Sequence, residues 1–297
     1  MNEKRPLIIT HDKHFHADDV FSVAALDLYF KGAYDLLRTR DPEVIKTGDI
    51  VLDVGGVYDA ASDRFDHHQE EGAGMRDAHI PYSSFGIVWK KYGNDVCDSA
   101  DVAAQVGKTL GAYLDADDNG IETHTKILDV PRYALRTVIK MFRPFLDETE
   151  TLDEAFVKAV SFAKWVLEKE IRRAKEYIRE RDIVLSAYQS TEDKRVLAFD
   201  EFLRVSDDVA KECPELLFIV LPRDGQTSWM VRAVQSGTGD FAARKMFPAS
   251  WRAKSGRAMA EASGVLDAEY CHHSGNFLAV AKTREGAIAL ARLAASS

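Results

Sequence analysis

The sequence predicts an α/β protein in which an N-terminal parallel-sheet domain is joined by a long helix to a smaller C-terminal α/β domain. The chain has 297 residues, which exceeds the usual length of a single domain. In its first part, short apolar runs alternate with amphipathic ones, as in parallel sheets with crossover helices. From Leu152 to Arg181, apolar residues recur every three or four positions, which predicts one long helix. We place the domains at residues 1–180 and 181–297.

The elements of the first domain follow from their apolar periodicity. LIIT at 7–10 is an apolar run that favours a buried strand, and the amphipathic run 17–29 favours a helix behind it. The apolar run 49–56 ends on two glycines, which permit a tight turn after a strand. The remaining expected elements are a strand at 36–40 and helices at 83–93 and 100–114.

The second domain is expected to contain several strands and a closing helix. Apolar and β-branched residues dominate four of its segments, and such segments favour strands. The last segment has small and apolar residues at helical spacing. The expected strands are DIVLSAY (182–188), RVLAF (195–199), ELLFIVLP (215–222) and SWMVRAV (228–234), and the expected helix is GAIALARLAA (286–295).

Charge is distributed unevenly along a chain whose formal net charge is −9. Residues 1–120 contain 22 acidic and 12 basic residues, together with most of the histidines, whereas residues 221–297 contain 10 basic and 6 acidic residues. An acidic first part suits bound cations, and a basic tail suits anions. The net negative charge disfavours long, non-specific adhesion to nucleic acid and fits a short single-stranded substrate better.

Cysteines and hydropathy exclude several classes of protein. Cys97, Cys213 and Cys271 have no CxxC spacing, so neither a disulfide framework nor a thiolate zinc site is expected. No apolar run approaches the roughly 20 residues that a membrane span requires, and the first residues lack an apolar targeting core. We therefore expect no membrane association and a cytoplasmic location.

Imidazole and carboxylate side chains gather where the first strands are expected to end. Ligands of open α/β sheets bind beyond the carboxyl ends of the strands, so these segments could contribute to one site. A set of imidazoles and carboxylates without thiolates favours Mn²⁺, Mg²⁺ or iron, and there are enough ligands for two ions. Carboxylates this dense repel one another unless cations are bound. The segments contain His11, Asp12, His14, His16, Asp18 and Asp19, then Asp53, then Asp66, His67 and His68.

The ordered segments THDKHFHADD, VLDVGGVYD, RFDHHQ and LDADDNGI resemble the DHH phosphoesterase superfamily. They are most similar to its melanocyte-proliferating-gene branch, whose members are regarded as metal-dependent 3′-to-5′ RNA exonucleases. In the tail, WMVRAV, DFAARKMFPASWR, CHHSGNF and AKTREGAIALARLA resemble the same branch in the same order. The resemblance therefore covers nearly the whole chain, and it departs from the branch around residues 137–147.

The resemblance implies a set of metal ligands. His16 stands where most of the superfamily has aspartate, and this additional imidazole favours Mn²⁺, with Mg²⁺ as the alternative. His68 would contact phosphate or donate a proton, and Asp66 would orient an imidazole. The segment DADDNG, taken alone, also fits a helix end followed by a turn. The implied ligands are His11, His16, Asp18, Asp53 and His67, with Asp115 or Asp118 completing the set.

Other side chains have either a functional or an ordinary structural interpretation. Asp12, His14, Asp19 and Asp59 fit solvated loop positions. In the basic tail, we expect cationic and small residues to hold phosphate, and aromatic residues either to stack a base or to lie in the core. The expected phosphate contacts are Arg244, Arg252, His272, Ser274 and Gly275, and the aromatic residues are Trp229, Trp251 and Phe277.

The function expected from these features is hydrolysis of a phosphodiester by a hydroxide that two divalent ions activate. The substrate would be RNA or a short single-stranded oligonucleotide, shortened from its 3′ end. Two alternatives remain open at this point. One is another metal-dependent hydrolase, acting on pyrophosphate, a small nucleotide or a peptide; the other is a non-catalytic, metal-stabilised RNA-binding scaffold. A homodimer is the default expectation for the assembly.

Overall fold

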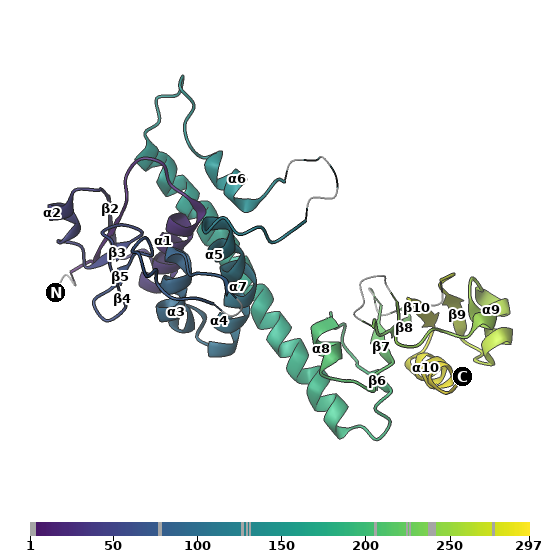
Figure 1. Cartoon of the computed structure of the whole chain (residues 1–297). Coiled ribbons are helices and arrows are strands. Elements are labelled where there is room, and N and C mark those ends of the chain that lie inside the picture. Colours follow the sequence, from purple (N-terminus) through teal and green to yellow (C-terminus); the bar gives the residue numbers. More distant parts are fainter. Residues whose placement is uncertain are drawn as a thin grey trace. The chain divides into compact units, whose positions relative to one another are not determined.

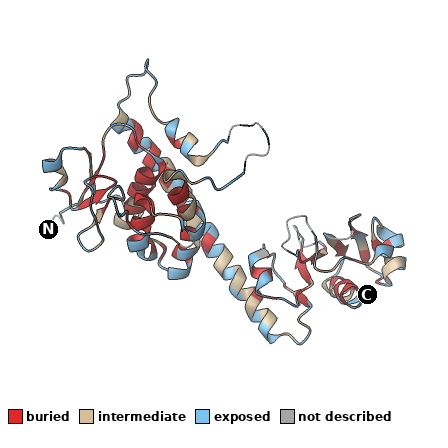
Figure 2. Ribbon diagram, in the orientation of Figure 1, coloured by how far each residue is buried: buried red, intermediate tan, exposed pale blue. Residues whose placement is uncertain are grey.

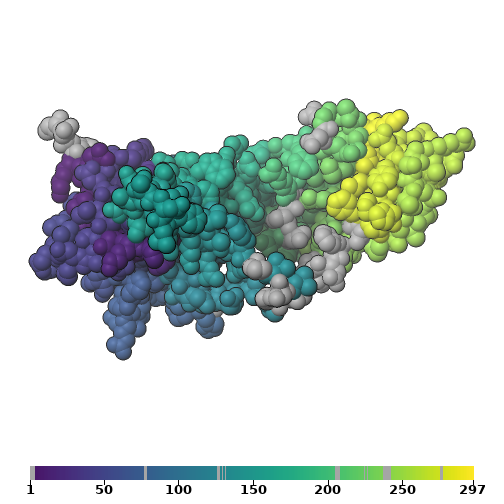
Figure 3. Space-filling model, turned by 90° about the horizontal axis from the view of Figure 1, so that it is seen from above, coloured from purple at the N-terminus to yellow at the C-terminus, as the bar shows by residue number. Residues whose placement is uncertain are grey.

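The computed structural model describes residues 4–76, 79–125, 128, 130, 132–204, 207–223, 225, 227–236, 242–274 and 277–297. The chain forms two compact units, Met1–Lys175 and Glu176–Ser297. Each unit contains its own mixed sheet with helices, which confirms the predicted α/β class (Figure 1). Figure 3 colours the surface of the first unit from purple to teal and that of the second from green to yellow.

The first sheet has the strand order β2-β1-β3-β5-β4. Strands β1 (Leu7–Thr10), β2 (Asp35–Arg38), β3 (Ile50–Leu52) and β5 (Arg64–Phe65) are parallel, as predicted, and the short β4 (Tyr58–Asp59) adds an antiparallel edge. Because β1, β3 and β5 are neighbours and run in the same direction, the residues that follow them meet at one edge of the sheet.

The helices of the first unit bury most of its apolar residues. Helix α1 (Ala17–Phe30) packs against α3 (Ser84–Cys97), and both contain many buried residues (Figure 2). The expected helix 100–114 is α4 (Ala100–Val106), followed by a π-helical turn at Gly107–Gly111 and α5 (Ala112–Asp118). Two short helices, α2 (Pro42–Ile45) and α6 (Leu135–Lys140), were not predicted.

Helix α7 (Leu152–Ser190) confirms the long helix and extends beyond its predicted end. The prediction of a strand at 182–188 is wrong, because this segment forms the last turns of α7. Its residue Val184 is fully buried, and Tyr177 and Tyr188, at helical distances from it, pack on the same cluster of apolar residues. Tertiary packing and continuation of an existing helix outweigh the local β-propensity of isoleucine and valine.

The second sheet has the order β6-β7-β8-β10-β9 and is buried on both faces of β7. Phe218 and Val220 face one apolar cluster, together with residues of α10, whereas Ile219 and Leu221 face the other, together with α7. This alternation follows from the two-residue repeat of a strand. The elements are β6 (Val196–Ala198), α8 (Asp207–Lys211), β7 (Phe218–Pro222), β8 (Trp229–Ala233), a 3₁₀ turn at Ala249–Trp251, α9 (Gly256–Ser263), β9 (Ala268–Cys271), β10 (Leu278–Ala281) and α10 (Arg284–Ser296).

Three of the predicted strands and the closing helix of the second domain are therefore confirmed, while β9 and β10 were missed. Among the helices in the described ranges, none combines the length and apolar character needed to cross a membrane.

Replacing Phe156 with alanine should destabilise the first unit by about 3–5 kcal/mol, the usual cost of removing a buried aromatic ring. Phe156 is fully buried, contacts Phe15 edge-on at 5.5 Å between ring centroids, and lies beneath the Arg38 guanidinium at 4.5 Å. The matched control is Val157→Ala on the exposed side of the same helix, which should change stability by no more than about 0.5 kcal/mol. Urea denaturation measures both, and equal losses would contradict this role for Phe156.

Candidate metal centre

Three loops bring the predicted ligands together beyond the carboxyl ends of β1, β3 and β5. His11 directly follows β1, Asp53 directly follows β3, and Asp66 directly follows β5. Asp53 adopts a left-handed backbone conformation, with φ of 54°, and its N–H donates to the carbonyl of Phe65 at 3.0 Å. An unfavourable backbone conformation held in place by its surroundings is typical of a functional position.

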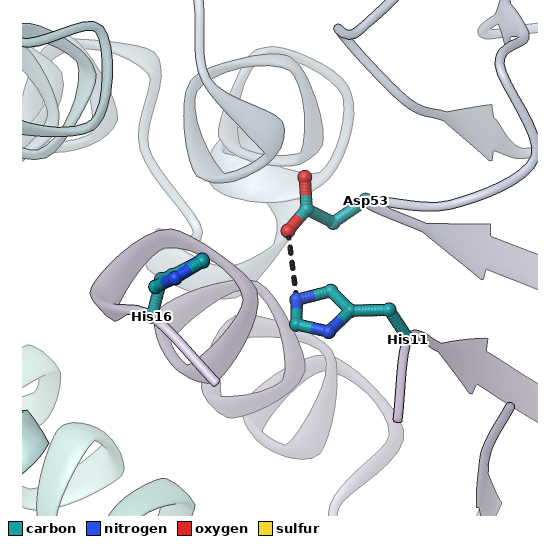
Figure 4. A group of neighbouring side chains, drawn as sticks. All are labelled: His11, His16 and Asp53. Atoms are coloured by element: carbon teal, nitrogen blue, oxygen red, sulfur yellow. Dashed lines mark ion pairs between the residues drawn. The ribbon is translucent and has the colours of Figure 1, made fainter. Parts of the chain in front are cut away.

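His11 is almost completely buried and faces two carboxylates. Its Nδ1 lies 3.0 Å from the carbonyl oxygen of Asp12, so Nδ1–H is the donor and Nε2 is the nitrogen free to bind a proton or a cation. Nε2 lies 3.2 Å from Asp53 Oδ2, as Figure 4 shows, and 3.2 Å from Asp19 Oδ2. Burial alone would lower the pKa of His11, but the two carboxylates outweigh it and raise this pKa to about 10.

His67 is the centre of a second group of carboxylates. Its Nε2 lies 3.3 Å from Asp53 Oδ1, 3.2 Å from Asp118 Oδ2 and 3.8 Å from Asp18 Oδ2. Asp18 is fully buried in the first turn of α1, where burial and the charges of Asp53 and Asp118 raise its pKa well above its usual range. Burial also raises the pKa of Asp118, and the charge of Asp53 contributes in the same direction, whereas His67 opposes it.

Several buried polar atoms of this cluster have no hydrogen-bond partner. Buried polar atoms in proteins are nearly always hydrogen-bonded, so atoms that face one another within ion-pair distance but form no hydrogen bond point to a bound ion. Ligand atoms close enough to hold an ion form three overlapping groups, which share His16 and Asp53, so the donor set fits two divalent cations. The buried atoms without a hydrogen bond are Asp18 Oδ1 and Oδ2, Asp19 Oδ2, Asp53 Oδ1 and His67 Nε2. The three groups are His11, His16 and Asp53; Asp53, His67 and His68; and His16, Asp18 and Asp118.

Asp66 and His68 form a hydrogen-bonded pair at the edge of the cluster, where His68 Nδ1 also lies 3.5 Å from Asp53 Oδ1. Asp66 Oδ1 accepts from the His68 ring nitrogen Nδ1 at 2.7 Å and from its backbone N–H at 3.1 Å, and Oδ2 accepts from the Gly56 N–H at 2.6 Å. Burial opposes ionisation of Asp66, but these hydrogen bonds outweigh burial and lower its pKa. The same bond raises the pKa of His68, whose side chain is 63% exposed. The predicted orienting aspartate thus holds His68 at the open side of the site.

The structure distinguishes between the two candidate aspartates of α5. Asp118 faces His67. Asp115 is fully buried, and its carboxylate binds Ser83 and Arg76 instead of facing the candidate ligands. Asp115 Oδ1 accepts from the N–H and hydroxyl of Ser83 at 3.0 and 2.7 Å, and Oδ2 pairs with Arg76. A Cβ atom at Gly86 would collide with this carboxylate, so glycine is required there. We therefore remove Asp115 from the predicted ligand set and retain Asp118.

Asp19 belongs to the cluster, although its sequence position also fitted a solvated loop. It is fully buried at the third position of α1, and its Oδ1 accepts from the His16 N–H at 2.8 Å. Its other oxygen faces His11. The reciprocal capping pattern of His16 and Asp19 at the start of the helix was the signal that could have identified it.

The predicted phosphate contacts of the tail have different environments. Arg244 is not available to an anion, because its guanidinium donates to the backbone carbonyls of Ala210, Cys213, Pro214 and Leu216. The prediction that Arg244 contacts phosphate is therefore wrong, because the carbonyls at the end of α8 and in the turn before β7 need hydrogen-bond donors and the guanidinium supplies them.

Of the other tail residues, His272 contacts the Ser274 hydroxyl at 2.7 Å and the ring of Phe277 at 5.5 Å. Arg252 is half-buried, with Nη2 3.8 Å from Met246 Sδ. Trp251 is a core residue, Trp229 is half-buried beneath Arg284, and Gly275 lies outside the described residues.

A cavity of about 220 Å³ adjoins the candidate metal ligands His16, Asp18 and Asp118. Two basic residues of α6, Arg136 and Lys140, also line it. They were not among the predicted site residues, although their four-residue spacing, which places them on one face of a helix, was a usable signal.

Comparison with known proteins gives a consistent result. Residues 7–295 match the model of the MYG1 exonuclease family, described as "Uncharacterised protein family (UPF0160)". A MYG1 protein of Schizosaccharomyces pombe is 29% identical over 97% of this chain and 96% of its own length. A MYG1 protein of Chlamydia pneumoniae is 30% identical over 93% and 92%, and the MYG1 exonuclease of Homo sapiens is 27% identical over 97% and 85%.

Replacing Asp118 and Asp115 separately with asparagine should have opposite effects. Asp118→Asn should weaken Mn²⁺ binding and leave the fold stable. Asp115→Asn should retain Mn²⁺ binding but lower the free energy of unfolding by about 3–5 kcal/mol, because Arg76 loses its buried partner. Metal titration and urea denaturation measure the two properties, and loss of metal in Asp115→Asn without destabilisation would contradict the assignment.

Metal binding should release protons at neutral pH. His11 must lose the proton on Nε2 before this nitrogen can bind a cation, and its pKa of about 10 keeps the proton bound at pH 7. The affinity for Mn²⁺ should therefore increase with pH up to about 10, by about tenfold per pH unit for each displaced proton. Calorimetry in buffers with different ionisation enthalpies measures the release, and buffer-independent heats would contradict it.

Proposed function

We propose, because this chain belongs to the MYG1 exonuclease family, that it is a metal-dependent phosphodiester hydrolase that shortens RNA or a short single-stranded oligonucleotide from its 3′ end. Relatives from Homo sapiens and Mus musculus carry the name exonuclease, which supports a nuclease-type hydrolase. The segment RFDHHQ supports placement in the DHH phosphoesterase superfamily as part of the same proposal.

The observation that carries this proposal is the cluster of buried carboxylate and imidazole atoms that form no hydrogen bond at the edge of the first sheet. One cation would be held by His11, His16 and Asp53, and a second by Asp18, Asp53, His67 and Asp118. When bound, such ions activate water as a nucleophile and stabilise negative charge on the oxygens of a phosphodiester. Imidazole ligands support Mn²⁺ as the preferred ion.

The chain itself supplies a proton carrier in this proposal. Asp66 binds Nδ1 of His68, so Nε2 is the ring nitrogen that can exchange a proton with the substrate. The carboxylate of Asp66 raises the pKa of His68 and so favours its protonated form, which suits donation of a proton to the leaving oxygen. The exposed ring provides the access to substrate that this role needs.

The accessibility of the site argues against a purely structural metal site. His16 is exposed and lines the cavity, so one side of the cluster is open to a substrate. Structural metal sites are instead closed by protein ligands. Arg252, His272 and Ser274 remain proposed phosphate contacts in the second unit, without Arg244.

The test is to incubate the full chain and Mn²⁺ with RNA labelled at the 5′ end or at the 3′ end. A 3′-to-5′ exonuclease should release labelled mononucleotide at once from the 3′-labelled RNA and produce a ladder from the 5′-labelled RNA. Parallel reactions with single-stranded DNA and pyrophosphate test the substrate class. Hydrolysis of pyrophosphate with intact RNA would favour the small-phosphate alternative.

His68→Ala should lower the rate of RNA hydrolysis by about 10²- to 10⁴-fold and leave the number of bound Mn²⁺ ions unchanged. Asp66→Asn should also lower the rate, because the ring loses its anchoring carboxylate. His124→Ala is the control, since this histidine is exposed and contacts Thr123 rather than the cluster. Loss of a bound ion in His68→Ala would identify His68 as a ligand instead.

A further inference from the structure

The cavity beside the metal cluster has an acidic wall and a basic wall. The acidic wall comes from the start of α1 and the end of α5, and the basic wall comes from α6. The lining residues are His16, Ala17, Asp18, Leu114, Asp117, Asp118, Arg136 and Lys140.

Helix α6 is anchored in the first unit at several points. Ile139 is fully buried, and α6 packs against α1, which carries the metal ligand Asp18. Just beyond the helix, the Arg143 guanidinium donates to the carbonyl of Phe15, in the loop that precedes His16. These contacts fix α6 beside the ligands, so the position of its basic side chains follows from the packing.

The two basic residues are only partly neutralised. Arg136 Nε lies 3.5 Å from Asp117 Oδ1, and the Arg136 side chain remains 47% exposed. Lys140 is exposed, and within the part of the chain that the structure describes it forms no ion pair. Burial raises the pKa of Asp117, whereas the positive charges of Arg136, Arg132 and Lys140 act to lower it. The single carboxylate of Asp117 therefore interacts with three cationic side chains.

The charge balance of the cavity depends on the metal. Two divalent cations would match the four carboxylates of the cluster, which are those of Asp18, Asp19, Asp53 and Asp118. Arg136 and Lys140 would then outnumber the one remaining acidic residue of the cavity, Asp117. With the metal bound, the cavity therefore has a net positive charge and suits an anion.

We propose that Arg136 and Lys140 form a phosphate-binding site that holds the phosphate group of a nucleotide against the metal cluster. Guanidinium and ammonium groups are the side chains that bind phosphate most strongly, through charge-assisted hydrogen bonds. This inference rests on the proposed function and names the residues that recognise its substrate. The proposed phosphate site lies in the same unit as the metal cluster. A mononucleotide with one phosphate group should therefore be sufficient to occupy it.

The experiment compares 5′-AMP with adenosine, both binding to the Mn²⁺-loaded full chain, in the wild type and in the double variant Arg136→Gln/Lys140→Gln. The wild type should bind 5′-AMP more tightly than adenosine. The double variant should lose about tenfold or more of this preference, because two cations no longer contact the phosphate. Adenosine binding and the number of bound Mn²⁺ ions should stay the same.

Two further variants separate charge from structure. Arg136→Lys/Lys140→Arg retains both charges and should keep most of the preference for 5′-AMP. Lys46→Gln removes an exposed cation that directly follows α2 and does not line the cavity. Its ammonium group lies 2.6 Å from the carboxylate of Glu43, and its removal should have no effect on the preference for 5′-AMP. An unchanged preference for 5′-AMP in Arg136→Gln/Lys140→Gln would overturn the site.

Hydrolysis of RNA is measured on the same proteins, so that the two proposals can fail separately. If the wild type degrades no RNA but the double variant loses its preference for 5′-AMP, the exonuclease proposal fails and the phosphate site stands. If the wild type degrades RNA and the double variant has an unchanged KM and an unchanged preference for 5′-AMP, the phosphate site fails and the exonuclease proposal stands.

Discussion

Repulsion among buried carboxylates is the constraint on which the rest of the first unit depends. Asp18, Asp19 and Asp53 are almost fully buried and converge on two imidazoles, and the pKa of Asp18 is raised well above its usual range. Such an arrangement costs folding free energy unless cations occupy it. The surrounding structure must therefore hold the cluster together before the metal binds. The apolar contact of α1 with α3 and the buried strands β1 and β3 provide this stability.

The order of the strands converts three distant segments into one site. β3 lies between β1 and β5, so the residue after β3, Asp53, is flanked by His11 on one side and His67 on the other. Asp53 directs one carboxylate oxygen to each imidazole, which explains how a single residue can belong to two groups of ligands. Burial opposes the ionisation of Asp53, but contacts with both imidazoles outweigh burial and lower its pKa, which favours its charged form.

The fold class and the positions of the central candidate ligands could be predicted because they depend on local sequence. A buried strand followed by a polar residue places that residue at the sheet edge, so His11 and Asp53 follow directly from the pattern. The choice between Asp115 and Asp118 could not be made in this way. They are three residues apart on one helix, and only the distant residues Arg76 and Ser83 determine which carboxylate is used for structure. The role of Arg244 could not be predicted either, because its guanidinium donates to backbone carbonyls that come from a separate part of the chain.

Three histidines of the site show how one side chain acquires different functions from its surroundings. In His11, the carbonyl of Asp12 binds Nδ1, and Nε2 is buried against the carboxylates of Asp19 and Asp53. His67 is also buried, with Nε2 among carboxylates. His68 is the next residue along the chain, yet its ring is largely exposed and its Nδ1 is bound by Asp66. The two rings lie 4.3 Å apart between centroids, yet they have different partners, because His67 Nε2 faces Asp118 and Asp18 whereas Asp66 binds His68 Nδ1. Asp66 therefore fixes the tautomer of His68, with the proton on Nδ1, and leaves Nε2 free on a ring that is largely exposed.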